Sequence, residues 1–333
     1  HRGLLPGLLH RQRLPRQLGD GDASAEARTG LASAELDNGR LLSAISLLES
    51  VHSDLTARHD AVGRTLAARA HGLHGRILLY RGQAGDGLRH LQSAVKLLPD
   101  DAEDLRCHLE IDLARVEALG HHYQKALKTL HEVERRPSAR HLPRVRLRLY
   151  LYRGQVRAVL GADDATQDLR QAIAEAEQLS MPTYAARASV FLGERRFWQR
   201  RDAEAVAAFE AAVAAARTGR DRLGEAMART YLLRFGADDP DLAEFVDALA
   251  LPSLRANLLL AHAARGTALP GTDEALDALQ RDVDLPLSLH LRVLTWLDRP
   301  ASARSLVRTI GERFQQRSVR QRFLQQWSSG IRV

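Results

Sequence analysis

The chain of 333 residues is rich in apolar residues (45%) but poor in aromatic ones (5%), a balance that favours helices over sheets. Its net charge of +7 comes from 48 basic and 41 acidic residues that are interspersed, unlike the concentrated basic patches of nucleic-acid-binding proteins. A single cysteine, Cys107, excludes an internal disulfide framework and indicates a reducing, cytoplasmic location, and no apolar run is long enough to cross a bilayer.

Residues 1–21 contain Pro, Gly, Leu and Arg without a sustained helical period. This pattern predicts a linker that enters from an upstream domain. Pro6 and Pro15 would break the basic amphipathic helix that a membrane anchor needs.

From Ala23 onward the sequence predicts successive helical hairpins. The first has a helix near 25–35, a turn at Asp37-Asn38-Gly39 and a second helix striped by small and aliphatic residues. Three further hairpins follow, with proline stops at Pro99, Pro137 and Pro182.

The clearest hairpin lies within residues 192–212. Leu192 and Gly193 lie on its first helix, and Ala205, Phe209 and Ala212 form one stripe on its second. Small residues let the two backbones approach, and Phe209 fills the gap toward the next hairpin. Across the hairpins, the residues predicted to provide this packing are Gly75, Gly87, Leu91, Ala94, Ala126, Gly154, Leu192, Gly193, Ala205, Phe209 and Ala212.

Corresponding positions begin the second helices at Ala44, Gly87, Ala126, Ala165 and Ala205, at intervals of 43, 39, 39 and 40 residues. This pattern resembles the tetratricopeptide repeat (TPR) family, in a variant longer than the standard repeat of about 34 residues and similar to those of large bacterial signalling proteins. The resemblance implies an all-α solenoid of stacked antiparallel hairpins, elongated and curved, with five repeats over residues 22–220.

Residues 221–333 keep the helical period while the repeat signature weakens, which predicts degenerate repeats and a C-terminal capping helix. Helices are expected near 222–235, 240–250, 252–265, 272–282, 286–297, 300–316 and 318–328. Phe323 and Trp327 on the last helix either cover the final core layer or support self-association.

The resemblance implies that the first helix of each hairpin lines a concave groove. Positions six residues before and one residue after its small packing residue lie about two turns apart and share a helix face. The residues predicted to line the groove, with three nearby aromatic side chains, are Arg69, Arg76, Tyr80, His108, Arg115, Arg148, Gln155, Arg187, Phe197 and Trp198. Such a groove would bind an acidic or carboxylate-terminated peptide through arginine side chains. Alternatively, these arginines pair with acids of the adjacent repeat or remain solvated.

No phosphate-binding glycine loop, nucleophile elbow or zinc pattern occurs, so neither an enzyme nor a cofactor is predicted. His71 and His74 lie one helical turn apart, but no cysteine or acid stands near them at ligand spacing, and no metal site is predicted. His121 and His122 are expected to be solvated in a turn.

We therefore predict a non-catalytic protein- or peptide-binding scaffold or sensor for signal transduction. The chain would form the C-terminal part of a larger bacterial regulator that carries a kinase or ATPase domain. Two alternatives are a helical-repeat RNA-binding protein and a self-assembling structural module. The RNA code needs a recurrent polar pair in repeats of near-constant length, and the 43-residue interval argues against it.

Overall fold

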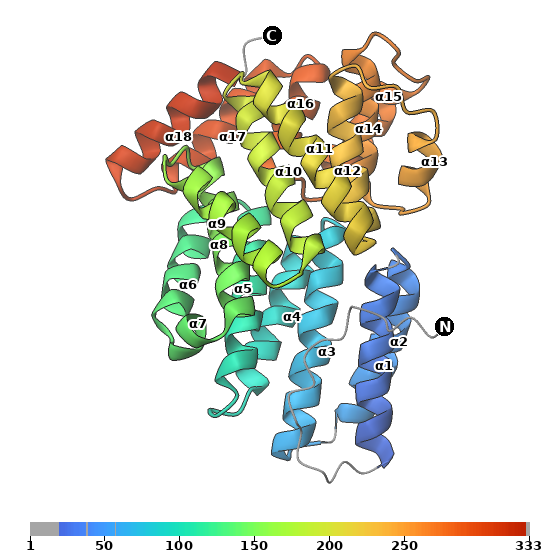
Figure 1. Ribbon diagram of the computed structural model, residues 1–333, viewed down its shortest axis with the longest axis vertical. Coiled ribbons are helices and arrows are strands. Elements are labelled where there is room, and N and C mark those ends of the chain that lie inside the picture. Colours follow the sequence, from blue (N-terminus) through green and yellow to red (C-terminus); the bar gives the residue numbers. More distant parts are fainter. Residues whose placement is uncertain (1–19, 38, 57, 331–333) are drawn as a thin grey trace.

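The computed structural model describes residues 20–37, 39–56 and 58–330 (Figure 1). All regular structure in these ranges is α-helical, as expected. The helices are α1 (Asp20–Asp37), α2 (Leu41–Leu55), α3 (Ala61–Tyr80), α4 (Ala84–Leu97), α5 (Glu103–Leu119), α6 (Tyr123–Arg135), α7 (Pro137–His141), α8 (Pro143–Val159), α9 (Ala165–Gln178), α10 (Pro182–Trp198), α11 (Asp202–Gly219), α12 (Arg222–Arg234), α13 (Leu242–Asp247), α14 (Pro252–Ala264), α15 (Thr272–Asp282), α16 (Leu287–Trp296), α17 (Pro300–Glu312) and α18 (Arg317–Gly330).

The helices pair as consecutive antiparallel hairpins, and the hairpins stack in chain order (Figure 1). The first helix of each hairpin contacts the first helix of the next, so α1, α3, α5, α8, α10, α12, α14 and α16 form one continuous layer. The second helices cover this layer from outside. The architecture is an α-solenoid, as the repeat pattern predicts.

Small residues allow close approach within the hairpins. A Cβ atom added to Gly193 would lie 2.6 Å from Cε1 of Phe209, and one added to Gly75 would lie 2.6 Å from Cγ of Leu91. Phe209 is fully buried and stacks on Tyr231 of the next hairpin at a ring distance of 4.5 Å. Neighbouring hairpins therefore share one core, which no single hairpin could form.

The solenoid is wound more tightly than an elongated stack. The backbone N–H of Asp284, between α15 and α16, donates to the carbonyl of Gly82 in the α3–α4 turn at 2.7 Å. At the C-terminus, the indole N–H of Trp327 donates to the Val159 carbonyl at 2.7 Å. Trp327 and Phe323 are buried within this chain. Hairpins distant in sequence therefore meet, and α18 packs against α8 as well as α17.

The structure differs from the sequence expectations at Pro137 and describes the N-terminal region only in part. Pro137 does not simply end a hairpin, because it occupies the first turn of the short helix α7. The linker expected for residues 1–21 lies outside the described residues up to residue 19, and α1 begins at Asp20. Asn38 of the first turn also lies outside them. In the described part of the chain, no helix is both long and apolar enough to span a membrane.

Candidate functional site: an arginine cluster on the inner helices

Four positions on the first helix of a hairpin share one face. Counted from the small packing residue they are −6, −2, +1 and +5, and separations of four, three and four residues follow the helical turn. In the second to fifth hairpins several of these positions carry arginine, tyrosine or aspartate. We name seven of them the inner-face cluster: Arg76 and Tyr80 of α3, Asp112 and Arg115 of α5, Arg148 and Tyr152 of α8, and Arg187 of α10.

Asp112 lies at the centre of the inner-face cluster. Its Oδ1 accepts a hydrogen bond from Nη2 of Arg148 at 2.7 Å and another from Nη1 of Arg115 at 2.8 Å. Its side chain is only 5% exposed. Burial alone would raise the pKa of Asp112, but Arg148, Arg115 and Arg76 outweigh burial and hold this pKa well below its usual range. Asp112 therefore stays charged and links α5 to α8.

Two tyrosines enclose Arg115. The guanidinium carbon lies 4.4 Å from the ring centre of Tyr152 and 5.8 Å from that of Tyr80. Nη2 of Arg115 also donates to the Tyr80 hydroxyl at 3.4 Å. Burial tends to raise the pKa of Tyr80, but Arg187, Arg115 and Arg76 together bring it below the ordinary value. Arg187 acts on Tyr80 from a helix three hairpins away, which places the first-helix layer on the inside of the superhelix.

The inner-face cluster carries more positive than negative charge. Arg187 forms an ion pair with Asp221 at 3.3 Å, and Asp112 forms ion pairs with both Arg115 and Arg148. The side chain of Arg76 forms no ion pair with any described residue. Four guanidinium groups thus share two carboxylates. In addition, the buried Nε of Arg148 has no acceptor among the described residues. Such an arrangement can accept a further anionic group.

A second arginine region continues along the inner helices α10–α16. Nη1 of Arg292 donates to Oδ1 of Asn257 at 2.8 Å, and the guanidinium of Arg234 lies 5.1 Å from the ring centre of Phe197. Burial, followed by the charge of Arg292, lowers the pKa of Arg234 to about 10. Nearby, the Tyr231 hydroxyl donates to Glu194 at 2.5 Å. This region also combines cationic and aromatic side chains.

The remaining groove residues predicted from the sequence are not all brought together. Arg69 points to the first hairpin and pairs with Glu26 at 3.4 Å, so the alternative of pairing between repeats holds for this residue, as it does for Arg148 with Asp112 and Arg187 with Asp221. His108 lies 2.8 Å from Nη1 of Arg148 and supports the cluster, while Gln155 lies half-buried on α8. The ring of Trp198 packs against Trp327 of α18, with ring centres 5.0 Å apart, and so faces the C-terminal cap.

The inner-face cluster is packed rather than open. The side chains of Arg115, Arg148 and Arg187 are 9%, 11% and 18% exposed. Arg76 and Arg187 are partly exposed, whereas the side chain of Asp112 is only 5% exposed.

Sequence reasoning missed Asp112 and Tyr152, which both occupy position −2 of the same helix face. Position −2 could have been predicted from the sequence, because positions −6 and +1 already define the helix face to which it belongs. Asn257 and Arg292 lie on α14 and α16, where the weak repeat signature gives no reference residue from which to count.

The only cysteine is a poor nucleophile in this setting. Cys107 is fully buried, and burial raises the pKa of its thiol to about 12. The thiol therefore stays protonated at neutral pH and fills core space on α5.

Comparison with known proteins shows similarity in structure alone. No protein-family model matches the sequence, and no curated protein matches it. A solved structure of a Rap protein complexed with competence and sporulation factor is similar with a TM-score of 0.60 over 95% of this chain and 88% of the other, at 14% sequence identity. The apo form of RapI is similar with a TM-score of 0.50 over 86% of this chain and 99% of the other, again at 14% identity. The chain thus shares the all-helical fold of these two structures.

Proposed function

We propose that this chain is a non-catalytic, TPR-type module of a bacterial regulatory protein, and that it binds an acidic or carboxylate-terminated peptide, or a protein segment of that kind, at its inner face. The excess of guanidinium groups in the inner-face cluster carries this proposal. Four arginines share two carboxylates there, and one buried arginine nitrogen lacks an acceptor among the described residues. The Rap structure in complex with competence and sporulation factor supports a binding role for this fold.

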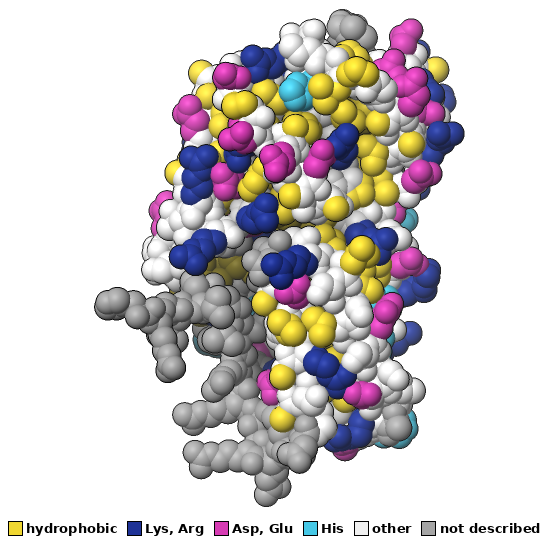
Figure 2. All heavy atoms as spheres, turned by 90° about the vertical axis from the view of Figure 1, so that its right-hand side faces the viewer, with side chains coloured by type: hydrophobic (Ala, Val, Ile, Leu, Met, Phe, Trp, Pro, Cys, Tyr) yellow, Lys and Arg dark blue, Asp and Glu magenta, His cyan; other side chains and the backbone are white. Residues whose placement is uncertain are grey.

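The chemistry of the inner-face cluster favours a peptide with both acidic and apolar side chains. Guanidinium groups bind carboxylates through paired hydrogen bonds. The ring of Tyr80, half-buried beside Arg115, offers apolar surface with a polar edge, whereas Tyr152 is buried behind Arg115. On the face shown in Figure 2, acidic and basic side chains are interspersed, so the chain's positive charge is not gathered there.

Binding at the inner face would change the winding of the superhelix. Within the inner-face cluster the charge of Arg187 on α10 acts on Tyr80 of α3, and these helices belong to hairpins far apart in sequence. A carboxylate that replaces Asp112 as the partner of Arg148 would release α5 from α8. The ligand would thereby favour a different curvature, which an attached kinase or ATPase domain could sense. The repeats of residues 22–220 would bind the ligand, and residues 221–333 would cap the array.

The test changes Arg76 and Arg187 and leaves Arg148 intact. Arg148 is more buried and pairs with Asp112, so a negative charge at position 148 would repel the Asp112 carboxylate. We measure binding of an array of hexapeptides that differ in acidic content, each with a free or an amidated C-terminus. The unaltered chain should prefer acidic peptides with free carboxylates. The double variant Arg76→Gln/Arg187→Gln should bind them at least about 100-fold more weakly, since each of the two lost charged hydrogen bonds contributes about 1.5–3 kcal/mol.

Arg217→Gln/Arg281→Gln is the charge-matched control, because it removes two positive charges from other helices, where both side chains are 64% exposed. The control should keep full affinity. Equal weakening in both double variants, or no preference for acidic peptides, would contradict the proposal. Tight, steeply salt-dependent binding of RNA oligonucleotides instead would favour the RNA-binding alternative.

A further inference from the structure

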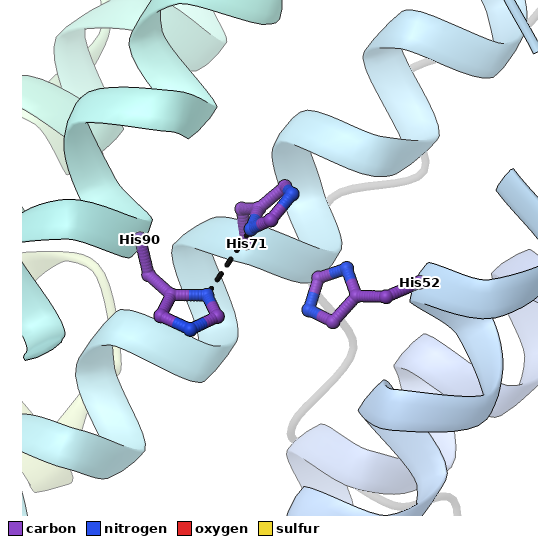
Figure 3. A group of neighbouring side chains, drawn as sticks. All are labelled: His52, His71 and His90. Atoms are coloured by element: carbon purple, nitrogen blue, oxygen red, sulfur yellow. Dashed lines mark hydrogen bonds between the residues drawn. The ribbon is translucent and has the colours of Figure 1, made fainter. Parts of the chain in front are cut away.

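Four histidines from three consecutive helices lie together near the N-terminal end of the solenoid. They are His52 of α2, His71 and His74 of α3, and His90 of α4, and we name them the histidine cluster. All of the neighbouring ring centres lie between 4.1 and 5.8 Å apart. Figure 3 shows how the rings of His52, His71 and His90 extend from separate helices toward a common space.

The nitrogen atoms of the histidine cluster are spaced for metal coordination. Nδ1 of His71 lies 3.1 Å from Nδ1 of His90, and Nδ1 of His74 lies 3.4 Å from Nε2 of His52. Zinc–nitrogen bonds of about 2.0–2.1 Å in a tetrahedron place two ligand nitrogens about 3.3 Å apart. One nitrogen from each of His52, His71 and His90 lies within 4.8 Å of the other two. Small side-chain rotations therefore suffice to bring them around one ion.

The imidazoles are kept uncharged, as metal ligands must be. Burial, followed by the neighbouring imidazoles, lowers the pKa of His52 to about 3 and that of His71 and His74 to about 4. Burial also lowers the pKa of His90, although the charge of Asp86 opposes this. A neutral imidazole can coordinate a metal ion through its unprotonated nitrogen.

An ion could reach the histidine cluster from solvent. A surface cavity of about 390 Å³ is lined by His71, His74 and His90 together with Asp86 and Ser93. Neutral imidazoles leave the charge of a divalent ion uncompensated, and the nearby carboxylate of Asp86 would offset part of it. Arg89 also lines this cavity, but its side chain is 74% exposed and pairs with Asp86.

We propose that the histidine cluster binds one divalent late-transition-metal ion, with one nitrogen from each of His52, His71 and His90 as ligands. An all-nitrogen ligand set favours zinc and its neighbours over magnesium or calcium, which require oxygen. The ion would clamp α2 to α4 across α3 and so fix the first hairpin against the second. This proposal does not depend on the peptide-binding function, because the histidine cluster shares no residue with the inner-face cluster.

The test measures zinc binding to the tag-free chain after dialysis against a chelator, by calorimetry at pH 7.5. The unaltered chain should bind one zinc ion with a Kd below about 1 µM. The double variant His71→Ala/His90→Ala should bind at least 100-fold more weakly. Cobalt provides a second readout, because tetrahedral coordination gives it strong visible absorption that this variant should lose.

His131→Ala/His141→Ala is the matched control, since it removes two imidazoles from α6 and α7, away from the histidine cluster. The single variants His52→Gln and His90→Gln keep a polar side chain of similar size and guard against loss of folding, which circular dichroism monitors. They should weaken zinc binding at least tenfold, whereas the control should not. Substoichiometric binding, or an affinity that these cluster variants leave unchanged, would overturn the proposal.

Discussion

Asp112 illustrates how one residue can serve both stability and function. Its carboxylate is buried between Arg115 and Arg148, and no other described carboxylate forms an ion pair with either of them. Removing a buried charge partner leaves the remaining charges uncompensated, which costs far more than losing a surface ion pair. The same removal would free two guanidinium groups for an external anion.

Asp112→Asn should therefore lower stability and strengthen ligand binding together. We expect a loss of about 3 kcal/mol in the free energy of unfolding, measured by urea denaturation. Affinity for acidic peptides should rise in the same variant. In Asp54→Asn, where the carboxylate is 58% exposed, stability should change by less than about 0.5 kcal/mol. Lost stability without any gain in affinity would mean that the arginines are purely structural.

Individual contacts between helices were the hardest features to predict. His71 and His74 are visible as a pair one turn apart, but His52 and His90 each lie on a different helix. Only the packing of α2, α3 and α4 brings the four rings together. Similarly, Arg69 fits the predicted ladder in sequence, yet it pairs with Glu26 of the first hairpin.

The positions of the helices are easier to predict from the sequence than the contacts between individual residues. Proline and glycine mark local boundaries, and the expected helix at 272–282 coincides with α15 (Thr272–Asp282). Helix α7 was missed, because five residues are too few to show a helical period. The expected fixed ladder of cations also differs from the structure. The residues of the inner-face cluster lie near the C-terminal end of α3 but near the N-terminal end of α10, because each hairpin is displaced along the superhelix relative to the hairpin before it.

The turn between α5 and α6 provides a pH-dependent contact with α16. His121, expected to be solvated, instead packs 6.4 Å from the ring of His290 and contacts the Tyr123 hydroxyl at 3.0 Å. Burial, followed by the charges of His290, Arg313 and His122, lowers the pKa of His121 to about 4. The ordinary pKa of histidine is 6.5, so as the pH falls His121 is protonated in the unfolded chain before it is protonated in the folded chain. Stability from this contact is thus complete above pH 6.5 and is lost as the pH falls toward 4.

We expect the free energy of unfolding to decrease between pH 7.5 and pH 5, and His121→Asn to reduce this decrease by about 2 kcal/mol. Asparagine suits the position because His121 has a φ of 61°, a left-handed conformation that asparagine tolerates. Urea denaturation at both pH values provides the measurement. The exposed His141→Asn should leave the pH dependence unchanged, and an equal effect of both substitutions would show that the α5–α6 turn is not responsible.

For the whole molecule, the repeat pattern predicts a stack of hairpins but not how tightly it winds. Superhelical curvature is the sum of small rotations between neighbouring hairpins, and small side-chain differences set each rotation. The contact between Gly82 and Asp284 depends on that sum, since 202 residues separate the two positions. Nothing local in the sequence signals it.

Gly82 and Gly266 provide a matched test of this closure. Their φ angles are 69° and 72°, so alanine pays the same backbone penalty of about 1 kcal/mol at each. A Cβ atom on Gly82 would lie 2.9 Å from the Asp284 carbonyl oxygen, whereas one on Gly266 meets nothing within 4 Å. Gly82→Ala should therefore be less stable than Gly266→Ala by about 1–3 kcal/mol. Small-angle scattering should show a larger radius of gyration for Gly82→Ala alone, and equal values would argue against closure through this contact.

Hydrogen exchange of the chain with and without its tightest acidic peptide tests inner-face binding most directly. Bound peptide should slow exchange in α3, α5, α8 and α10, and Arg76→Gln/Arg187→Gln should abolish the effect. Slowed exchange confined to the outer helices α4, α6, α9 and α11, unaffected by that substitution, would contradict binding at the inner face.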